Sequence, residues 1–369
     1  MIKVTLNNDM LKMILKIEEN RYKQKNIELP ISIANKLRKN SKKKSSYSSN
    51  KIEGNPLSEK QANDIIEQDH HKHLLRPEIE IRNYFLALNL LEEKIKHKKP
   101  FSKKMILEVQ SLVEKGASKE KIGLRGPMPP GMLFAVYDSV TGNPEYIPPE
   151  YIDINDLLDE LVDYVNTTND HPLIIAALVH YQLVTIHPFE DGNGRTARLL
   201  SGYILDYYGY GFNGIGSLEE YFAYDTNEYY QSLQMNLPAL YYSGRNNPPH
   251  IEIWITYFLR MVELYSSKVC EITQDIKEDH IDNSLSHLSN KEIELLAYLL
   301  ENKINEFTPI NISKIFKVTN KTIINRCVKL TNNGFLKPNI VNQRITHYSL
   351  TNFSKQNADK IFSKQNKVA

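Results

Sequence analysis

Two helical segments of this chain meet at a short loop rich in reactive groups. The loop and the start of the segment after it read HPFEDGNGRTAR, residues 187–198. The apolar run from Pro172 through Ile186 predicts a helix before the loop, with Asp170 as its cap, and residues 195–208 predict a buried helix after it. The fold must therefore hold a glycine-framed loop between two packed helices.

The glycines of this loop predict an anion-binding site. Gly192 and Gly194 allow positive φ, so that neighbouring backbone N–H groups converge on one point. The helix that follows directs its N-terminal amides at the same point. Arg195 and Arg198 are three residues apart and share roughly one helix face, from which both can reach a polyphosphate.

Two further side chains of the loop suit chemistry on bound phosphates. Asp191 is a hard oxygen ligand of the kind that Mg²⁺ takes when it bridges phosphates. His187 is the only group here that titrates near neutrality, so it is the candidate general base, and Phe189 is expected to turn inward. The competing interpretation, a helix-capping His beside a plain turn, suits an isolated His or Gly better than this combination. A Walker A motif is absent from the stretch.

The stretch resembles the Fic family signature, H-x-F-x-[DE]-G-N-[GK]-R-x-x-R, at every fixed position. Residues 177–182 and 186–189 also resemble that family, and a looser resemblance extends over about residues 30–270. Fic proteins are helical, and most transfer AMP from ATP to a hydroxyl of a target protein, releasing pyrophosphate. The resemblance implies an adenylyltransferase that uses ATP and Mg²⁺ and modifies a Tyr, Ser or Thr of a target protein or of itself. The GNG residues favour AMP transfer over the related toxin-type kinases.

The resemblance also implies a role for each residue of the loop. His187 would deprotonate the acceptor hydroxyl, and Asp191 would hold Mg²⁺ against the α- and β-phosphates. Asn193 would stabilise charge on the α-phosphate, and the two arginines would bind the β- and γ-phosphates. The residues that would contact the nucleotide here are Gly192, Asn193, Gly194, Arg195, Thr196 and Arg198.

A second motif lies far upstream of the loop. Residues 49–55 read SNKIEGN and resemble the inhibitory helix motif [ST]-x-x-x-E-[GN] of Fic proteins, with Ser49 and Glu53 at its fixed positions. In that family the Glu pairs with the second arginine of the signature, which is Arg198 here. A carboxylate on Arg198 would remove a γ-phosphate ligand and repel the incoming triphosphate. The alternative is an ordinary exposed Glu before a glycine turn.

Two flanking features resemble the family less closely. Residues 134–147 stand where Fic proteins place a β-hairpin flap that aligns the target segment by strand addition, with a turn expected at Thr141-Gly142-Asn143. Val136 and Tyr137 are the candidate contacts there. Tyr229 and Tyr230 resemble the paired tyrosines near the adenine, and core packing is an equally good interpretation of each ring.

The chain length of 369 residues predicts two or three domains in a mainly α-helical protein. We expect an N-terminal helical region with the inhibitory motif at 1–100, a Fic-type helical bundle core at 101–275 and a winged helix-turn-helix domain at 285–355. The polar residues 276–283 predict a linker. The lysine-rich residues 42–44 favour a solvated surface.

The last domain is predicted from three helices followed by a two-stranded wing at 335–350. Between Phe307 and Leu350 there are seven basic residues and no acidic ones, which favours DNA binding through phosphates. Winged helices also serve as protein-docking modules, so that alternative stays open. Asn290 is expected to cap the first of these helices.

Composition limits the remaining choices. The net charge of +2 gives no global attraction to nucleic acid or membrane, and the N-terminus resembles no signal peptide. No apolar run is long enough to span a membrane. Two cysteines far apart predict buried thiols in a reducing compartment, so we expect a cytoplasmic protein. Fic proteins often dimerise, so a homodimer is compatible with the resemblance.

Two alternatives to AMP transfer remain. The first is a DNA-binding regulator whose Fic core senses a nucleotide without turnover, although a sensor has no need of His187 as a base. The second is an enzyme that removes AMP from a modified protein, in which Glu53 would position water.

Overall fold

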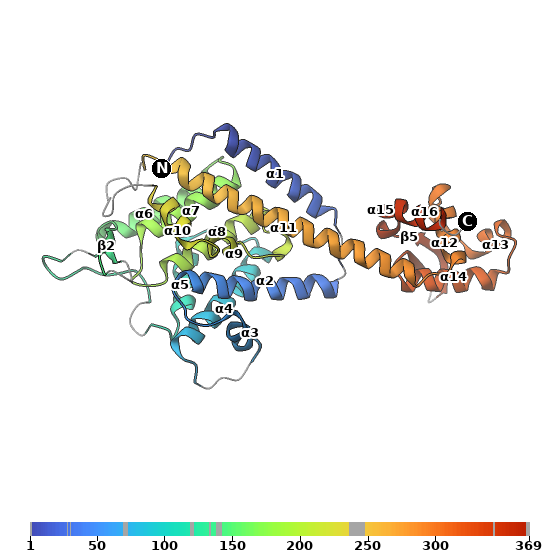
Figure 1. Ribbon diagram of the computed structural model, residues 1–369, viewed down its shortest axis with the longest axis horizontal. Coiled ribbons are helices and arrows are strands. Elements are labelled where there is room, and N and C mark those ends of the chain that lie inside the picture. Colours follow the sequence, from blue (N-terminus) through green and yellow to red (C-terminus); the bar gives the residue numbers. More distant parts are fainter. Residues whose placement is uncertain are drawn as a thin grey trace. The chain divides into compact units, whose positions relative to one another are not determined.

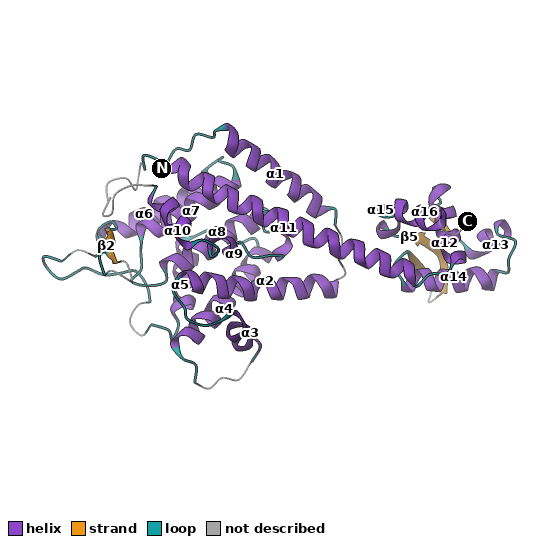
Figure 2. Cartoon of the chain, viewed as in Figure 1, coloured by secondary structure: helices purple, strands orange, loops and turns teal. Residues whose placement is uncertain are grey.

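The computed structural model describes residues 2–27, 29, 31–68, 73–118, 122–132, 134–137, 142–235, 248–341 and 344–366. The chain divides into two compact units, formed by Met1–Asn26 with Pro30–Glu271 and by Ile27–Leu29 with Ile272–Ala369. Helices make up most of both units (Figure 1), and the strands are confined to a hairpin and a small sheet (Figure 2). The mainly α-helical fold predicted from the sequence is therefore confirmed.

The first unit contains the helices that surround the loop at 187–198. They are α1 (Asn8–Lys25), α2 (Ile31–Ile52), α3 (Glu59–Glu67), α4 (Arg76–Lys96), α5 (Lys103–Glu114), α6 (Ile154–Thr167), α7 (Pro172–Ile186), α8 (Asn193–Tyr207), α9 (Glu219–Phe222), α10 (Thr226–Gln234) and most of α11 (Ile251–Ser286). Short 3-10 turns, η1 (Tyr151–Asp153) and η2 (Phe212–Gly214), join some of them. Strands β1 (Val136–Tyr137) and β2 (Pro144–Tyr146) pair antiparallel.

Helix α7 forms the core of this unit. Every residue from Leu173 to Leu183 is buried, as expected of a helix that is apolar on all sides. Helix α8 packs along it. The predicted cap is wrong: His171 accepts the hydrogen bond from the backbone N–H of Leu173, while Asp170 accepts one from Tyr164 Oη at 2.6 Å. The imidazole nitrogen does what a carboxylate was expected to do, because it lies one residue nearer the first turn.

Helix α2 corrects part of the expectation of a solvated basic surface, since Lys44 is exposed but Lys43 is buried. It packs against α4 and α9, and Ser45, Ser46, Ser48 and Ser49 are buried. Small side chains let the helices approach closely, which the polar composition concealed. Lys43 is buried along its stem and pairs with Glu67 at the edge of α3.

The predicted linker at 276–283 is wrong as well. These residues continue α11, which runs without interruption to Ser286. Ile281 and Leu285, four residues apart, are buried in the core of the second unit. The segment is a helix with a buried stripe.

The second unit combines helices with a three-stranded sheet. Its elements are α12 (Asn290–Glu301), β3 (Glu306–Phe307), α13 (Pro309–Ile315), α14 (Asn320–Asn332), β4 (Leu336–Val341), β5 (Arg344–Leu350), α15 (Asn352–Gln356) and α16 (Ala358–Asn366). The sheet is antiparallel in the order β3-β5-β4. Ser289, not Asn290, caps α12 in a capping box with Glu292.

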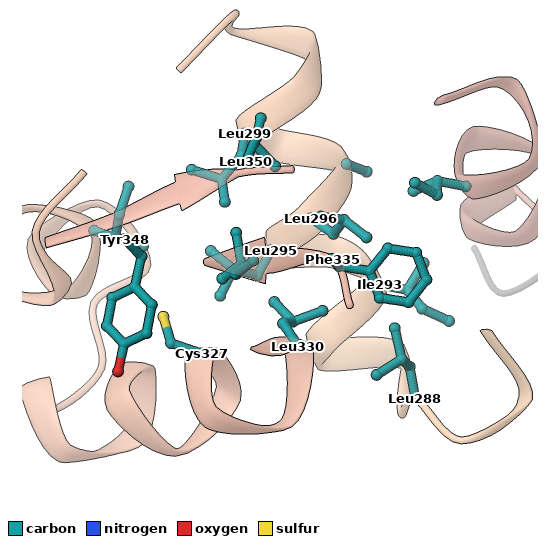
Figure 3. Packing of buried hydrophobic residues seen from close by; sticks show 14 of the residues in the cluster. Leu288, Ile293, Leu295, Leu296, Leu299, Cys327, Leu330, Phe335, Tyr348 and Leu350 are labelled. Carbon is teal, nitrogen blue, oxygen red and sulfur yellow. The ribbon is translucent and has the colours of Figure 1, made fainter. Parts of the chain in front are cut away.

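One apolar core holds this unit together. Figure 3 shows Leu295, Leu296 and Leu299 of α12 in one cluster with Leu330 of α14 and Phe335. Cys327 lies in the same core as a free thiol, and burial raises its pKa to about 12. The expected buried thiol is therefore present at this position.

Among the described helices, none combines the length and apolar character that crossing a bilayer requires.

Candidate functional site

The loop between α7 and α8 is held in shape by contacts among its own residues. His187 ends α7 in the left-handed region (φ 49°, ψ 57°), and Gly192 precedes α8 with φ 80°. Asn193 clamps the loop, because its side-chain amide donates to the carbonyl of Phe189 and accepts from the N–H of the same residue. Phe189 points inward and is 1% exposed. The glycine and the αL histidine thus set a rigid turn at the start of α8.

His187 is presented with one defined tautomer. Its Nδ1 lies 3.2 Å from the carbonyl oxygen of Val184, and since a carbonyl only accepts, Nδ1 carries the proton. Nε2 therefore keeps its lone pair. Arg125 donates to the carbonyl of His187 at 2.8 Å, and the ring of Phe134 lies 5.9 Å away between centroids. These contacts fix both the backbone and the ring of His187.

Burial also keeps His187 neutral. Desolvation lowers its pKa to about 4, and the charge of Arg125 lowers it further, while the hydrogen bond to Val184 acts in the opposite direction. At neutral pH the side chain is an uncharged imidazole with a free Nε2. It can accept a proton, as a general base must.

Arg198 binds the two residues of the upstream motif. Its Nη2 lies 2.6 Å from Glu53 Oε1 and 2.9 Å from the carbonyl oxygen of Ser49, and its Nε donates to Ser49 Oγ at 2.8 Å. Burial lowers the pKa of Arg198, but Glu53, Tyr229 and Tyr84 together outweigh burial, so the pKa rises above the usual value. The structure thus brings together the arginine and the carboxylate that the sequence placed far apart.

The Glu53 carboxylate lies directly against Gly194. A Cβ at position 194 would collide with Glu53 Oε1 and would lie 3.2 Å from Arg198 Nη1. A carboxylate thus sits at the N-terminus of α8, where backbone amides attract anions. It stands where the sequence predicted a phosphate.

Arg195 points to a different carboxylate. Its Nη2 donates to Glu114 Oε1 at 2.7 Å, and Asp191 Oδ1 lies 3.3 Å away. Both Glu114 and Arg195 are buried. Arg195 Nη1 also lies 3.7 Å from Glu80 Oε1, and among the described residues neither Nε nor Nη1 has a hydrogen-bond acceptor. A Cβ at Gly192 would lie 2.6 Å from Glu114 Oε1, so glycine is needed for this approach.

The charge state of Glu114 is balanced between two influences. Burial raises its pKa to about 7, and the charge of Arg195 acts in the opposite direction. Asp191 and Glu80 add to the rise. Three carboxylates therefore surround one arginine in this corner of the site.

Asp191 is the one predicted metal ligand. Its Oδ2 lies 3.1 Å from Arg76 Nη2, and its Oδ1 accepts from the N–H of Gly192 at 2.7 Å. No group of three metal-ligating side chains gathers in the part of the chain that the structure describes. A single carboxylate at the edge of an anion site nevertheless fits Mg²⁺, which is commonly held by one or two carboxylates and by the substrate's phosphates.

The remaining predicted nucleotide contacts differ in exposure. Tyr229 is buried at 1%, and its hydroxyl contacts His180 Nε2 at 2.9 Å and Arg198 Nη1 at 3.3 Å. Tyr230 is 43% exposed and donates to the carbonyl of Ile52. Thr196 is buried behind the loop. Of these three, only Tyr230 is exposed.

The predicted flap is present as the short hairpin β1–β2. Val136 pairs with Tyr146 and is half-buried, and Tyr146 donates to the carbonyl of Thr185 at the end of α7. Thr141 of the expected turn lies outside the described residues. The segment before the hairpin joins the loop through an isolated bridge between Leu124 and Phe189. The hairpin is thereby tied to the helix end that presents His187.

Three residues of the site were missed in the sequence. Glu114 ends an ordinary amphipathic helix, Arg76 begins another, and Arg125 lies in a stretch rich in glycine and proline. Arg76 pairs with Glu80 one helical turn further on, but all three residues reach the loop from positions far away in the sequence. Their significance depends on the fold bringing α4, α5 and residues 122–125 to the loop, and no local pattern carries that information.

Comparison with known proteins places the loop within a described family. Residues 100–205 match the sequence model of the Fic/DOC family. The protein adenylyltransferase Fic of Drosophila willistoni is 46% identical over 68 residues, which are 18% of this chain and 14% of that protein. The protein adenylyltransferase Fic of Drosophila grimshawi is 31% identical over 176 residues, 44% of this chain and 33% of that protein. The chain thus spans a third or less of the length of these relatives.

Solved structures show the same fold. A Fic family protein from Desulfovibrio desulfuricans G20 superposes with a TM-score of 0.57 at 18% identity, over 95% of this chain and 98% of that one. Residues 134–508 of Fic-1 from C. elegans give a TM-score of 0.55 at 26% identity, over 73% of each chain.

Proposed function

Because this chain carries a Fic/DOC-family domain at residues 100–205, we propose that it is a protein adenylyltransferase that moves AMP from ATP to a hydroxyl of a target protein or of itself. The observation that carries the proposal is His187, a neutral imidazole with a free Nε2 beside a glycine-framed anion site. Curated relatives of the matched segment carry the same activity in their names. The proposal specifies the acceptor by its chemical class, a protein hydroxyl.

The reaction follows from the groups in place. His187 Nε2 takes the proton of the acceptor hydroxyl, whose oxygen forms a bond to the α-phosphorus of ATP. The bond between the α-phosphorus and the bridging oxygen to the β-phosphorus breaks, and pyrophosphate leaves. Arg195, Arg198 and the amides at the start of α8 stabilise the charge that develops on the phosphates. Tyr230 offers its exposed ring to the adenine.

Mg²⁺ would be held by Asp191 together with the phosphates. When bound, it withdraws charge from the phosphate oxygens. Arg76 Nη2 donates to Asp191 Oδ2, and the Arg76 side chain is largely exposed. It can therefore turn toward solvent when the metal binds. The Arg76 guanidinium already balances the charge of Asp191, which is consistent with a position that binds positive charge.

The pairing of Glu53 with Arg198 is proposed to restrain this activity. Glu53 occupies the N-terminus of α8 and takes up the Arg198 guanidinium that the γ-phosphate needs. A triphosphate entering the site would meet a like charge and lose one cationic ligand. ATP would bind with its phosphates displaced from the geometry for transfer.

Intact-mass spectrometry after incubation of the full chain with ATP and Mg²⁺ tests the proposal. Glu53→Gly is expected to gain one or more AMP additions, and Glu53→Gly/His187→Ala is expected to gain none. Glu190→Gln is the matched control, since Glu190 is an exposed carboxylate in the same loop and should behave as wild type. Incubation with a cell lysate and labelled ATP extends the test to other acceptors. Transfer by neither self nor lysate in Glu53→Gly would refute AMP transfer.

A second candidate function concerns residues 289–350. Their order of helices and strands, with the sheet order β3-β5-β4, supports a winged helix-turn-helix. Five of the seven basic side chains are exposed and free of ion pairs with the described residues: Lys314, Lys317, Lys321, Lys337 and Arg344. Arg326 is buried, and Lys329 lies 3.5 Å from Glu292. This exposed charge favours a DNA-binding role beside the catalytic one.

A further inference from the structure

The end of α7 that presents His187 is closed by residues from another part of the chain. The last carbonyls of a helix have no partner within the helix and must find one elsewhere. The carbonyl of Val184 accepts from His187 Nδ1, and the carbonyl of Thr185 accepts from Tyr146 Oη at 2.7 Å. The carbonyl of His187, just past the helix, accepts from Arg125 Nε at 2.8 Å. Both outside partners, Tyr146 and Arg125, belong to the stretch between α5 and α6, which also carries the hairpin β1–β2.

Arg125 binds three backbone carbonyls around this helix end. Its Nε donates to His187, its Nη2 donates to Pro149, and its own backbone N–H donates to Pro188 at 2.9 Å. The side chain is 5% exposed. Because the carbonyls at a helix C-terminus carry partial negative charge, a buried guanidinium is stabilised there. Arg125 is therefore a cap of α7 that is supplied from outside the helix.

The segment that carries Arg125 is itself tied to the loop. Gln110, a fully buried side chain of α5, accepts from the N–H of Gly123 at 3.1 Å and donates to the carbonyl of Asp191 at 3.2 Å. A carbonyl only accepts and an N–H only donates, so only this orientation of the amide satisfies both. The backbone before Arg125 and the far end of the loop are thus held by one side chain, which fixes the place from which Arg125 reaches His187.

The conformation of His187 depends on such support. Its φ of 49° lies in the left-handed region, which a residue other than glycine keeps only where its surroundings hold it. Arg125 supplies this support twice. Its guanidinium binds the carbonyl of His187, and it also lies 4.8 Å from the centroid of the Phe134 ring, which in turn lies 5.9 Å from the ring of His187. Both the backbone and the imidazole of His187 therefore rest on Arg125.

We propose that Arg125 is a positioning residue for AMP transfer, which caps α7 and thereby holds His187 Nε2 where it takes the proton of the acceptor hydroxyl. The inference rests on the proposed function, because it assigns His187 the role of base. Without the guanidinium, the carbonyl of His187 loses its donor, and the imidazole is free to turn away from the carbonyl of Val184. A reacting group displaced by about 1 Å can lower the rate about 100-fold, whereas the anion site at the start of α8 is left in place.

Rates of AMP incorporation in the Glu53→Gly parent separate this role from nucleotide binding. Arg125→Met keeps the length of the side chain but removes its charge and its donors. The rate at saturating ATP should fall about 10- to 100-fold, and the KM for ATP should change less than about threefold. Arg125→Lys keeps a positive charge and one donor group at the end of α7, so it should recover part of the loss. Equal rates in Arg125→Met and the parent would overturn the proposal.

Arg21→Met is the matched control for these rates. Arg21, on α1, also donates to a carbonyl at the end of a helix, that of Tyr208, the last residue of α8, at 3.3 Å. This cap lies at the opposite end of α8 from the anion site and does not touch His187. Arg21→Met should therefore transfer AMP at the rate of the parent. A loss as large as that in Arg125→Met would show that the loss of any such cap slows transfer, and would overturn the specific role of Arg125.

The state of the His187 ring gives a readout that needs no catalysis. In ¹⁵N NMR of the histidine-labelled full chain at pH 7.5, His187 should appear as a neutral ring with its proton on Nδ1. The signal that His187→Gln lacks identifies it among the eleven histidines. In Arg125→Met, the two ring nitrogens should shift toward values averaged over both tautomers.

The two readouts distinguish a failure of this inference from a failure of the proposed function. Urea unfolding establishes that Arg125→Met folds, and Arg125→Lys, with a smaller expected shift, replaces it if it does not. An unchanged His187 signal in the folded variant overturns the positioning role. Absence of AMP transfer by the parent, together with a shifted His187 signal in the variant, would refute AMP transfer and support the hold of Arg125 on His187.

Discussion

Glu53 Oε1 and Arg198 Nη2 lie 2.6 Å apart, and this pair closes the N-terminus of α8. The two residues are separated by 145 positions in the chain; Arg198 lies in α8, and Glu53 is the first residue after α2. Arg198 is buried, whereas Glu53 is partly open to solvent. The pair therefore has one fixed member and one that can leave, which is the basis of the first prediction.

Glu53→Gln should accelerate self-modification, with a smaller effect than Glu53→Gly. The amide keeps the shape of the side chain but removes the charge that repels the γ-phosphate. A hydrogen bond to a charged group contributes about 1.5–3 kcal/mol, so weakening it should raise the rate about 10- to 100-fold. The initial rate of AMP incorporation measures the effect, and Glu190→Gln serves as control. A rate equal to that of wild type would show that the pair does not restrain transfer.

The rate of AMP transfer should change little between pH 7.5 and pH 5.5. Since the pKa of His187 is lowered to about 4, the imidazole stays neutral down to pH 5.5, whereas an ordinary histidine would be mostly charged there. The rate at pH 5.5 should remain within about twofold of that at pH 7.5, and an unperturbed base would lose about tenfold. The rate should be measured in the double variant Glu53→Gly/Glu114→Gln. The first change relieves the restraint, and the second removes the Glu114 carboxyl, whose pKa of about 7 would add its own pH dependence. A midpoint near pH 6.5 would contradict the lowered pKa.

The same shift has a consequence for stability. The folded-state pKa of His187 lies below the unfolded value of 6.5, so folding favours the neutral form. The contribution of the neutral His187 to the free energy of unfolding is fully present above pH 6.5 and is lost as the pH falls toward 4. Acid unfolding of wild type should therefore begin at higher pH than that of His187→Gln, which urea titrations at pH 5 and pH 7.5 can compare.

The sequence predicted the part of the site that is local. His187, Asp191, Gly194 and Arg198 lie within twelve residues of one another, and their spacing alone defines a turn followed by a helix. The pairing of Glu53 with Arg198 followed from a family resemblance. Nothing in the residues around Glu53 indicates where α2 will pack.

The rest depended on packing that no local pattern encodes. Residues 42–44 were expected to form a solvated surface, but Lys43 is buried together with the serines that follow it, because small side chains allow close helix contacts. Residues 276–283 seemed to be a linker, but Ile281 gives α11 a buried stripe. Asn193 was expected to face the phosphates, yet its side chain holds the backbone of Phe189. Polar residues are ambiguous in sequence, because their partners decide whether they bind a ligand or the protein itself.

Glu114→Ala should destabilise the protein strongly. It leaves the buried Arg195 guanidinium without its closest carboxylate, and removing one member of a buried pair commonly lowers the free energy of unfolding by about 3–5 kcal/mol. Glu114→Gln keeps an acceptor for Arg195 and should have a clearly smaller effect. Urea unfolding followed by circular dichroism measures both, and equal stability of Glu114→Ala and wild type would contradict the structural role of the pair.

Gly202→Ala should stabilise the protein. Gly202 lies inside α8, where its added Cβ meets open space, so the change removes backbone freedom from the unfolded chain without a steric conflict. The free energy of unfolding should rise by about 0.5–1 kcal/mol. Gly192→Ala is the contrasting variant, since its φ is 80° and its Cβ would lie 2.6 Å from Glu114 Oε1. Gly192→Ala should lower the free energy of unfolding. An equal increase in both variants would exclude the explanation by backbone freedom and steric fit.

Lys321→Ala should weaken DNA binding if residues 289–350 contact phosphates. Lys321 is exposed in the first turn of α14, the helix that would enter a groove. Fluorescence anisotropy with a labelled duplex at several salt concentrations should show a salt slope reduced by about one. Lys355→Ala, an exposed lysine on α15, is the control. Absence of any salt-dependent binding by wild type would favour a protein-docking role for this domain.

The position of Glu53 at the end of α2 has a consequence for how readily the site can open. The backbone carbonyls at a helix C-terminus carry partial negative charge, so α2 repels the carboxylate that it presents, while the N-terminus of α8 attracts it. Both effects fade within about one helical turn. Glu53 thus stands between two opposed helix ends, and its attraction to α8 would weaken steeply over a short displacement. A small movement of the last turn of α2 would be enough to release it, and the bundle behind it could stay as it is.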